Sequence, residues 1–271
     1  MNSEFVHLHN HSDYSLLDGA QTVQTLVNTI DDLGMDSVAL TEHGNMFSVI
    51  PYYKSAKSAG IKPIIGCETY VATGSRFDKK PRSDGGWGNN HLVLLAKNYD
   101  GYKNLMKLVT HGYLEGFYYR PRIDIDLLRE HSDGIICLSG CLKGKIPEKM
   151  LKDDWKGAKE AALRFSEIFP DRFYLEIQNH GIPDEEKTVE NIKKLSTELD
   201  LPMVCTNDAH YAKHEHWEAH DVHICLGTGK DRDDPNRLRY ATPEFYFKTQ
   251  DQMFELFKDI PSAIENTRKI A

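Results

Sequence analysis

The residues best suited to chemistry in this 271-residue sequence lie near its start. His7, His9 and His11 alternate with other residues directly after the apolar pair Phe5-Val6. Side chains of an extended segment alternate between two faces, so we expect the three imidazoles to point the same way. Imidazole and carboxylate groups gathered together are typical ligands of divalent Zn, Mn or Fe. The alternative is a polar N-terminal strand whose histidines face solvent.

Residues of the same chemical kinds recur along the sequence, in most cases directly after a short apolar run. They are His43, Glu68, Cys141, Asp208 and His210, together with Asp18 in the loop after the first run. The chain holds 13 histidines, so one such residue by itself is unremarkable. Their recurrence after five of seven expected strands favours a shared metal site. Taken singly, Asp18 has an alternative as an Asp-Gly turn and Cys141 as a buried thiol.

The elements that must position these residues are short strands alternating with helices. Beyond the first strand at residues 5–6, we predict strands over 37–41, 63–71, 91–96, 134–139, 173–177 and 203–206. We predict helices over 21–33, 47–59, 102–114, 146–151, 155–169, 184–199 and 261–271, and a long loop over 74–90. This alternation is typical of a mainly parallel sheet. Seven units favour one closed or nearly closed α/β barrel, with a doubly wound open sheet as the alternative.

In α/β barrels the functional residues lie at the C-terminal ends of the strands, where most of these ligand types fall. His91 is the exception, because it begins its apolar run instead of following it. It can join the others only if its strand runs antiparallel, as the return arm of a hairpin after Glu68. The sequence leaves this point open.

Composition restricts the class of protein. The hydrophobic fraction of 40% and the charged fraction of 27% are typical of a globular protein, and no apolar run approaches the roughly 18 residues of a membrane span. The five cysteines are odd in number and form no CxxC pair, which favours reduced thiols and a cytoplasmic location. A net charge of −8 argues against a broad surface that coats nucleic acid, although not against a local cationic rim.

Two expected loops carry cations and aromatic side chains that would suit a nucleic-acid substrate. The first has Arg76, Lys79, Lys80 and Arg82, and the second has Tyr118, Tyr119 and Arg120. Aromatic rings of this kind stack on unpaired bases. Each loop has an alternative as solvated chain or as packing against further domains. His180 is a candidate substrate contact, a partner of a ligand or a simple loop histidine. The histidines at 214, 216, 220 and 223 are expected to form the polar face of a helix, with a second metal site as the alternative.

A family resemblance rests on five short motifs. They are His9-Asn10-His11-Ser12, Thr41-Glu42-His43-Gly44, Gly66-Cys67-Glu68, Leu138-Ser139-Gly140-Cys141 and Asn207-Asp208-Ala209-His210. These resemble the successive motifs of the PHP (polymerase and histidinol phosphatase) superfamily. Intervening segments, such as residues 14–19 and 173–181, are similar to the N-terminal PHP domain of bacterial DNA polymerase III alpha subunits. The resemblance runs from about residue 4 to the last residue.

The resemblance implies a distorted (β/α)7 barrel of the PHP type that holds up to three divalent ions. Carried over by motif, the nine metal ligands are His9, His11, Asp18, His43, Glu68, His91, Cys141, Asp208 and His210. Asp18, Glu68 and Asp208 are the expected catalytic carboxylates, and a Cys141 thiolate favours Zn or Fe over Mg. Glu42 replaces the more common Asp before this histidine, but it is not a ligand position.

The implied activity is that of a metal-dependent phosphodiesterase, a 3′–5′ exonuclease that proofreads DNA 3′ ends. Residues 1–271 are then a single PHP domain, the N-terminal part of a longer polymerase whose remainder is its partner in cis, with no membrane involved. One alternative is a non-catalytic domain that metal merely stabilises. Another is a small-molecule phosphatase of the histidinol phosphatase type.

Overall fold

The computed structural model describes residues 4–80 and 88–271, whose strands and helices largely follow the predicted alternation. The strands are β1 Ser37–Leu40, β2 Lys62–Ala72, β3 Asn89–Ala96, β4 Arg122–Ile123, β5 Ile135–Leu138, β6 Phe173–Ile177 and β7 Met203–Cys205. The first helices are α1 Val23–Asp32, α2 Val49–Ser58, α3 Tyr99–Leu114, α4 Ile125–Glu130 and α5 Lys145–Leu151. The later ones are α6 Trp155–Ile168, α7 Pro183–Leu199, α8 Trp217–Thr228, α9 Gln250–Leu256 and α10 Pro261–Ile270, with a 3₁₀ turn at His214–His216.

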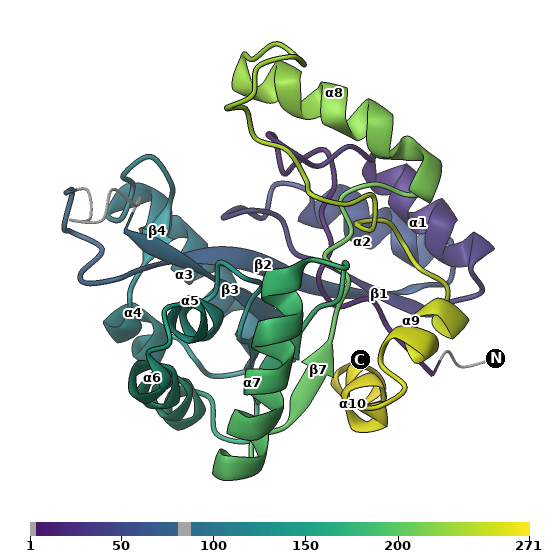
Figure 1. Cartoon of the computed structure of the whole chain (residues 1–271). Helices are drawn as coiled ribbons and strands as arrows, with labels where there is room; N and C mark the ends of the chain where they lie inside the picture. The colour runs from purple at the N-terminus through teal and green to yellow at the C-terminus, as the bar shows by residue number, and fades with distance from the viewer. Residues whose placement is uncertain (1–3, 81–87) are drawn as a thin grey trace.

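The strands form one curled sheet in the order β1-β2-β3-β5-β6-β7, with β4 beside β2 (Figure 1). The N-terminal segment, residues 5–11, closes this sheet, because it bridges to Val38 of β1 through His7 and to Ala209, beyond β7, through Asn10. The predicted distorted α/β barrel is confirmed, and the closing segment occupies the position of its first strand. This segment is an interrupted set of bridges instead of a regular strand.

β3 runs antiparallel to both of its neighbours, β2 and β5, whereas the other strand pairings are parallel. In the β2–β3 hairpin, His91 pairs with Tyr70, two residues beyond Glu68. The hairpin therefore brings the start of β3 level with the C-terminal part of β2. This is the arrangement in which His91 can reach the other ligand types.

The barrel has two apolar layers because side chains alternate along each strand. On β3, Leu92 and Leu94 pack outward against the helices, whereas Val93 and Leu95 belong to the inner cluster. The inner cluster is completed by Val6, Leu8, Ala39, Ile64, Ile136, Leu138 and Val204. These apolar residues fill the interior of the barrel. The polar groups are thereby confined to the C-terminal mouth.

Some features differ from the sequence-based expectation. β4 and α4 were not predicted, and α3 begins three residues earlier than expected because Asn98 caps it by accepting a hydrogen bond from Gly101 N. Residues 74–80 form an irregular loop with a turn at residues 76–77, while residues 81–87 lie outside the described part of the chain. α8 projects beyond the barrel at the top of the view (Figure 1). Within the described residues, no helix combines the length and apolar character of a membrane span.

Candidate metal centre

All nine side chains that the sequence analysis singled out as metal ligands lie together at the mouth of the barrel. They are His9 and His11 of the closing segment, Asp18 of the next loop, His43 after β1, Glu68 in β2, His91 in β3, Cys141 after β5, and Asp208 and His210 after β7. Glu68 lies at their centre. Its Oε1 is 2.6 Å from His91 Nδ1 and 3.9 Å from Cys141 Sγ. Its Oε2 contacts His43 Nδ1.

Within this cluster, three overlapping sets of three side chains have ligand atoms that all lie within 4.8 Å of one another. The sets are His11, His43 and His210; His9, His11 and Asp208; and His43, Glu68 and His91. Asp18 extends the cluster, since its Oδ1 lies 3.2 Å from His43 Nε2. His11 and His43 each belong to two sets. The arrangement therefore suits neighbouring cations that share ligands.

Seven polar atoms of the cluster are buried and make no hydrogen bond within the described residues. They are His9 Nε2, His11 Nε2, Asp18 Oδ1, His43 Nδ1, Glu68 Oε2, Asp208 Oδ1 and His210 Nε2. Buried polar atoms nearly always have a partner, so seven exceptions in one place require an explanation. Several face one another at ion-pair distance, such as His11 Nε2 and Asp208 Oδ1 at 3.1 Å. A cation between such atoms would satisfy them, and this donor set fits divalent transition metals.

In His9 and His11, the ring nitrogen that points away from the cluster contacts a residue that is not one of the nine proposed ligands. Glu176 Oε1 lies 2.7 Å from His9 Nδ1, and this carboxylate also accepts hydrogen bonds from Thr206 Oγ1 and Gly140 N. Ser15 Oγ lies 2.9 Å from His11 Nδ1. Hydrogen bonds of this kind fix the tautomer and orientation of a ligating imidazole. The second ring nitrogen of each histidine is thus left to face the cluster.

Glu42 supports the site from behind, although it offers no ligand. Its carboxylate is buried and accepts hydrogen bonds from the hydroxyls of Ser12, Ser15 and Ser48. Ser15 in turn touches His11 and accepts a hydrogen bond from His43 N. The carboxylate therefore organises the loop that carries two of the histidines. The role of this residue was not visible in the sequence.

Burial and opposite charge shift the pKa values of the clustered groups. Burial disfavours the charged form of His43, yet the carboxylates of Asp18 and Glu68 raise its pKa well above the usual value. Burial also opposes ionisation of Glu68, and His91 and His43 lower its pKa well below the usual value. Burial and the neighbouring imidazoles lower the pKa of His11 to about 3. The ionised carboxylate of Glu68 and the neutral ring of His11 are the forms in which these groups bind cations, whereas His43 must give up its proton to bind one.

His7 does not share the face of His9 and His11, so the expected alternation is wrong at this position. Its Nε2 lies 2.9 Å from Lys248 O, and its ring packs edge-on against Phe247. The neighbouring Val6 and Leu8 face the barrel interior, which places His7 outside. A bend at residue 9 then interrupts the alternation and turns His9 inward.

Two other histidines serve the scaffold of the mouth. His180 is buried, with Nδ1 at 2.6 Å from Glu185 Oε1 and Nε2 at 2.9 Å from Asn207 O. Both ring nitrogens are occupied, so the ring supports the segment before Asp208 and presents nothing to a substrate. On α8, His220 Nε2 lies 2.8 Å from Asp18 O and supports that loop.

The cations of the loop after β2 are used within the protein. Arg76 donates to Glu115 Oε2 at 2.6 Å and to Asp124 Oδ1 at 3.0 Å. Lys79 donates to the main-chain oxygens of Glu115 and Phe117. Lys80 is exposed, and the predicted contact Arg82 lies outside the described residues. The structure thus does not bring the described cations of this loop to the metal cluster.

The second predicted loop divides between structural and cleft-facing residues. The ring of Tyr118 lies 5.2 Å from the Arg122 guanidinium, which is itself buried. Tyr119 and Arg120 line a cleft of about 930 Å³ whose floor includes Asp18, Glu68 and Asp208. This volume is at the upper end of the range of about 300–1,000 Å³ for ligand sites. The cleft therefore accommodates a ligand much larger than a phosphate ion.

Tyr240 also lines the cleft and was not singled out from the sequence. Its hydroxyl donates to Asp18 Oδ2 at 3.3 Å, and its ring packs edge-on against His210. Burial and the nearby carboxylates raise the pKa of this hydroxyl well above its usual value, which keeps it a proton donor. Residues 229–241 form an irregular loop, where neither helical nor strand periodicity marks a particular side chain.

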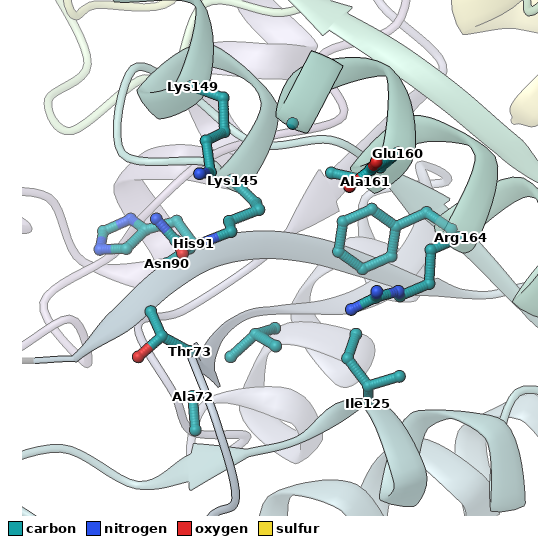
Figure 2. A pocket seen from close by; sticks show the side chains of 13 residues that line it. Ala72, Thr73, Asn90, His91, Ile125, Lys145, Lys149, Glu160, Ala161 and Arg164 are labelled. Carbon is teal, nitrogen blue, oxygen red and sulfur yellow. The ribbon is translucent and has the colours of Figure 1, made fainter. Parts of the chain in front are cut away.

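A smaller pocket of about 210 Å³ lies on the far side of His91, between β2, β3 and α6. Figure 2 shows Lys145, Lys149 and Arg164 around it, with Ile125 and Ala161 on its apolar walls. Lys149 donates to Asp154 Oδ2 at 2.6 Å, so part of the positive charge is neutralised within the protein.

Comparison with known proteins adds a family and two sequence relatives. The family model described as the PHP domain matches residues 7–180. The DNA polymerase III subunit alpha of Borreliella burgdorferi is 51% identical over 269 residues, which are 99% of this chain and 23% of that protein. The same subunit of Thermus aquaticus is 42% identical over an alignment of 273 residues, which covers 99% of this chain and 22% of that protein. The chain thus spans under a quarter of the length of these relatives.

Among solved structures, one match is a two-domain protein of Bacteroides vulgatus with a predicted PHP-like metal-dependent phosphoesterase. It has a TM-score of 0.46 and 16% sequence identity, over 76% of this chain and 52% of that one. A likeness this low carries no functional argument, so the function must be argued from the cluster and the family.

Proposed function

This chain belongs to the PHP domain family, and from that membership and the geometry of the ligand cluster we propose that it is a metal-dependent phosphoesterase. The observation that carries the proposal is the set of seven buried, unsatisfied polar atoms at the mouth of the barrel. The nine side chains of the cluster, which offer oxygen, nitrogen and sulfur donors, would hold up to three divalent ions. Bound ions would lower the pKa of a coordinated water and neutralise charge on a phosphoryl group.

The residues proposed as ligands are the nine of the cluster, and four of them can be described further. Asp18 and Glu68 are the proposed bridging carboxylates, since Asp18 meets His43 on one side and Glu68 contacts histidines of several segments. Asp208 joins His9 and His11, at 3.3 Å and 3.1 Å. Burial and the neighbouring carboxylates raise the pKa of the Cys141 thiol well above its usual value. A thiolate here therefore requires a soft cation, which favours Zn or Fe over Mg.

The substrate class that we propose is DNA, cleaved from its 3′ end as in proofreading. Two considerations support this choice. The cleft has room for a ligand much larger than a phosphate ion, and the sequence relatives are DNA polymerase subunits. In this proposal the chain is the PHP domain of a longer cytoplasmic polymerase, whose remainder would deliver the mismatched end.

The proposed activity is tested with a 5′-labelled primer that carries a mismatched 3′ end. We expect stepwise shortening in Mn²⁺ or Zn²⁺, which chelation stops and added metal restores. Asp18→Asn and Asp208→Asn should each abolish shortening, whereas Asp13→Asn, in the same loop but exposed, should not. Shortening that survives both site variants would exclude the cluster as its source. Metal-dependent thermal stability without turnover on any DNA end would favour the purely structural domain, and turnover of histidinol phosphate alone would favour the small-molecule phosphatase.

A further inference from the structure

Three aromatic side chains from two segments of the chain lie next to one another in the lining of the cleft. They are Phe47 just before α2, Tyr113 in α3 and Phe117 just after α3, and we call them the aromatic row. The ring centroids of Phe47 and Tyr113 are 6.0 Å apart, and those of Tyr113 and Phe117 are 6.2 Å apart. The row shares its cavity with Asp18, Glu68 and Asp208. The aromatic row and part of the ligand cluster therefore border the same cleft.

The aromatic row is exposed although its members are large and apolar. Phe47 is 57% exposed, Tyr113 36% and Phe117 49%. Such rings usually lie in a core, and contiguous exposed apolar surface typically marks a binding site. The centroids are too close together for a base to insert between neighbouring rings. Bases would therefore stack on the exposed faces, in succession along the row.

Two cations in the same cavity supply the charge that a nucleic-acid backbone requires. Arg120 and Lys143 line the cleft, and neither forms an ion pair with a carboxylate in the described part of the chain. The Arg120 guanidinium lies 5.7 Å from the centroid of Tyr70, so it is positioned without being neutralised. They contrast with Arg76, whose charge is satisfied by Asp124. An apolar protein segment would not need these two unpaired cations.

We propose that the aromatic row is the binding track for the unpaired nucleotides at the 3′ end of a DNA strand, with Arg120 and Lys143 on the phosphates. A track of stacked rings accepts every base sequence, because each base has an aromatic face. It does not accept a base pair, whose faces are already covered by stacking within the duplex. This inference deepens the proposed exonuclease and rests on it: the site would select frayed or mismatched ends over paired ones.

Binding tests the track separately from hydrolysis. The probe is a 5′-fluorescent single-stranded oligodeoxynucleotide whose 3′ linkages are phosphorothioates, titrated with the 271-residue chain and followed by anisotropy. Phe47→Ala and Phe117→Ala should each weaken binding about 5- to 150-fold, the effect of losing one stacked base. Phe117→Tyr should bind as the unmodified chain does, and Phe117→Leu should bind as weakly as Phe117→Ala. Leu114→Ala is the control, since Leu114 is exposed on α3 and does not line the cleft.

Salt dependence distinguishes the two parts of the track. Arg120→Gln should lower the slope of log affinity against log salt by about one, whereas the Phe47 and Phe117 variants should leave that slope unchanged. A blunt duplex should bind more weakly and respond to neither aromatic variant. The proposal is overturned if Phe117→Leu binds normally, or if the aromatic variants weaken duplex and single strand equally, as they would if a protein segment covers the row. Loss of binding in these variants without any hydrolysis by the unmodified chain would refute the exonuclease alone.

Discussion

Charged side chains are concentrated both in the ligand cluster and in the loop that follows β2, but the two regions use them differently. In the cluster, buried atoms such as His9 Nε2 and Asp208 Oδ1 face one another without a hydrogen-bond partner. In the loop, Arg76 and Lys79 are satisfied by carboxylates and main-chain oxygens of the segments that they cover. The cluster therefore has polar atoms that can still bind a ligand, whereas the hydrogen bonds of these two loop cations already stabilise the fold.

This difference shows that residue type alone does not identify a binding group. A ligand is distinguished by one polar atom that has a hydrogen-bond partner and a second that has none. In His9, Nδ1 contacts Glu176, whereas Nε2 has no hydrogen-bond partner in the described residues. A side chain satisfied at every polar atom, such as His180, is part of the scaffold. The comparison makes definite predictions, because variants of the two regions should fail in different ways.

Glu68→Gln should have the largest effect. Glu68 contacts histidines of three segments, and loss of its charge removes the group shared by most of the cluster. We expect loss of bound metal and a fall in hydrolysis of about 10³-fold, since metal ions contribute several kcal/mol and each 1.36 kcal/mol is tenfold. Elemental analysis after dialysis and a primer-shortening assay measure both. Glu160→Gln, on the exposed face of α6, should change neither, and retention of full metal content by Glu68→Gln would contradict the central role of this carboxylate.

Glu176→Gln should have a smaller effect, because it alters the support of a ligand and not a ligand itself. Weakening the contact with His9 Nδ1 should lower metal affinity or activity about 10- to 100-fold. Asp124→Asn is a matched control, since Asp124 is also buried and accepts a hydrogen bond from Arg76 at 3.0 Å, but contacts no proposed ligand. A metal titration should separate the two. Equal losses in both variants would mean that they act through general destabilisation.

The sequence predicted the positions of most strands and the grouping of the ligand types well because both depend on local patterns. Apolar runs marked six of the seven regular strands, and ligand types at strand ends converge in any barrel of parallel strands. Even the position of His91 followed from one stated condition, an antiparallel hairpin, which the structure meets. The exception is His7, where a single bend at residue 9 overrides the alternation of an extended chain. No side-chain pattern reports such a bend.

The rim was predicted poorly because its contacts join distant segments. Arg76 and Asp124 are 48 residues apart, so nothing in either stretch shows that one satisfies the other. The same holds for Phe47 and Tyr113, whose contact depends on how α2 and α3 pack. Tyr240 lies in an irregular loop without periodicity. Sequence patterns thus locate the side chains of regular elements and say little about which loop residues remain free.

Arg76→Gln tests the loop side of the comparison. It should destabilise the fold by about 1–2 kcal/mol through loss of the partly buried hydrogen bonds to Asp124, without loss of metal. A denaturant titration measures the stability, and elemental analysis measures the metal. If the Arg76→Gln protein instead has normal stability and binds single-stranded DNA poorly, Arg76 contacts nucleic acid, as the sequence analysis predicted.

Lys80→Ala should have the smallest effect of all, and its result bears on the whole loop. Lys80 is exposed and does not line the cleft, so its removal should change the free energy of unfolding by less than about 0.5 kcal/mol. The salt slope for single-stranded DNA should stay unchanged, in contrast to Arg120→Gln. If Lys80→Ala instead lowers that slope by about one, Lys80 contacts a phosphate. The bound strand would then extend past the cleft and over the loop after β2, and the loop would have a binding function that its internal ion pairs conceal.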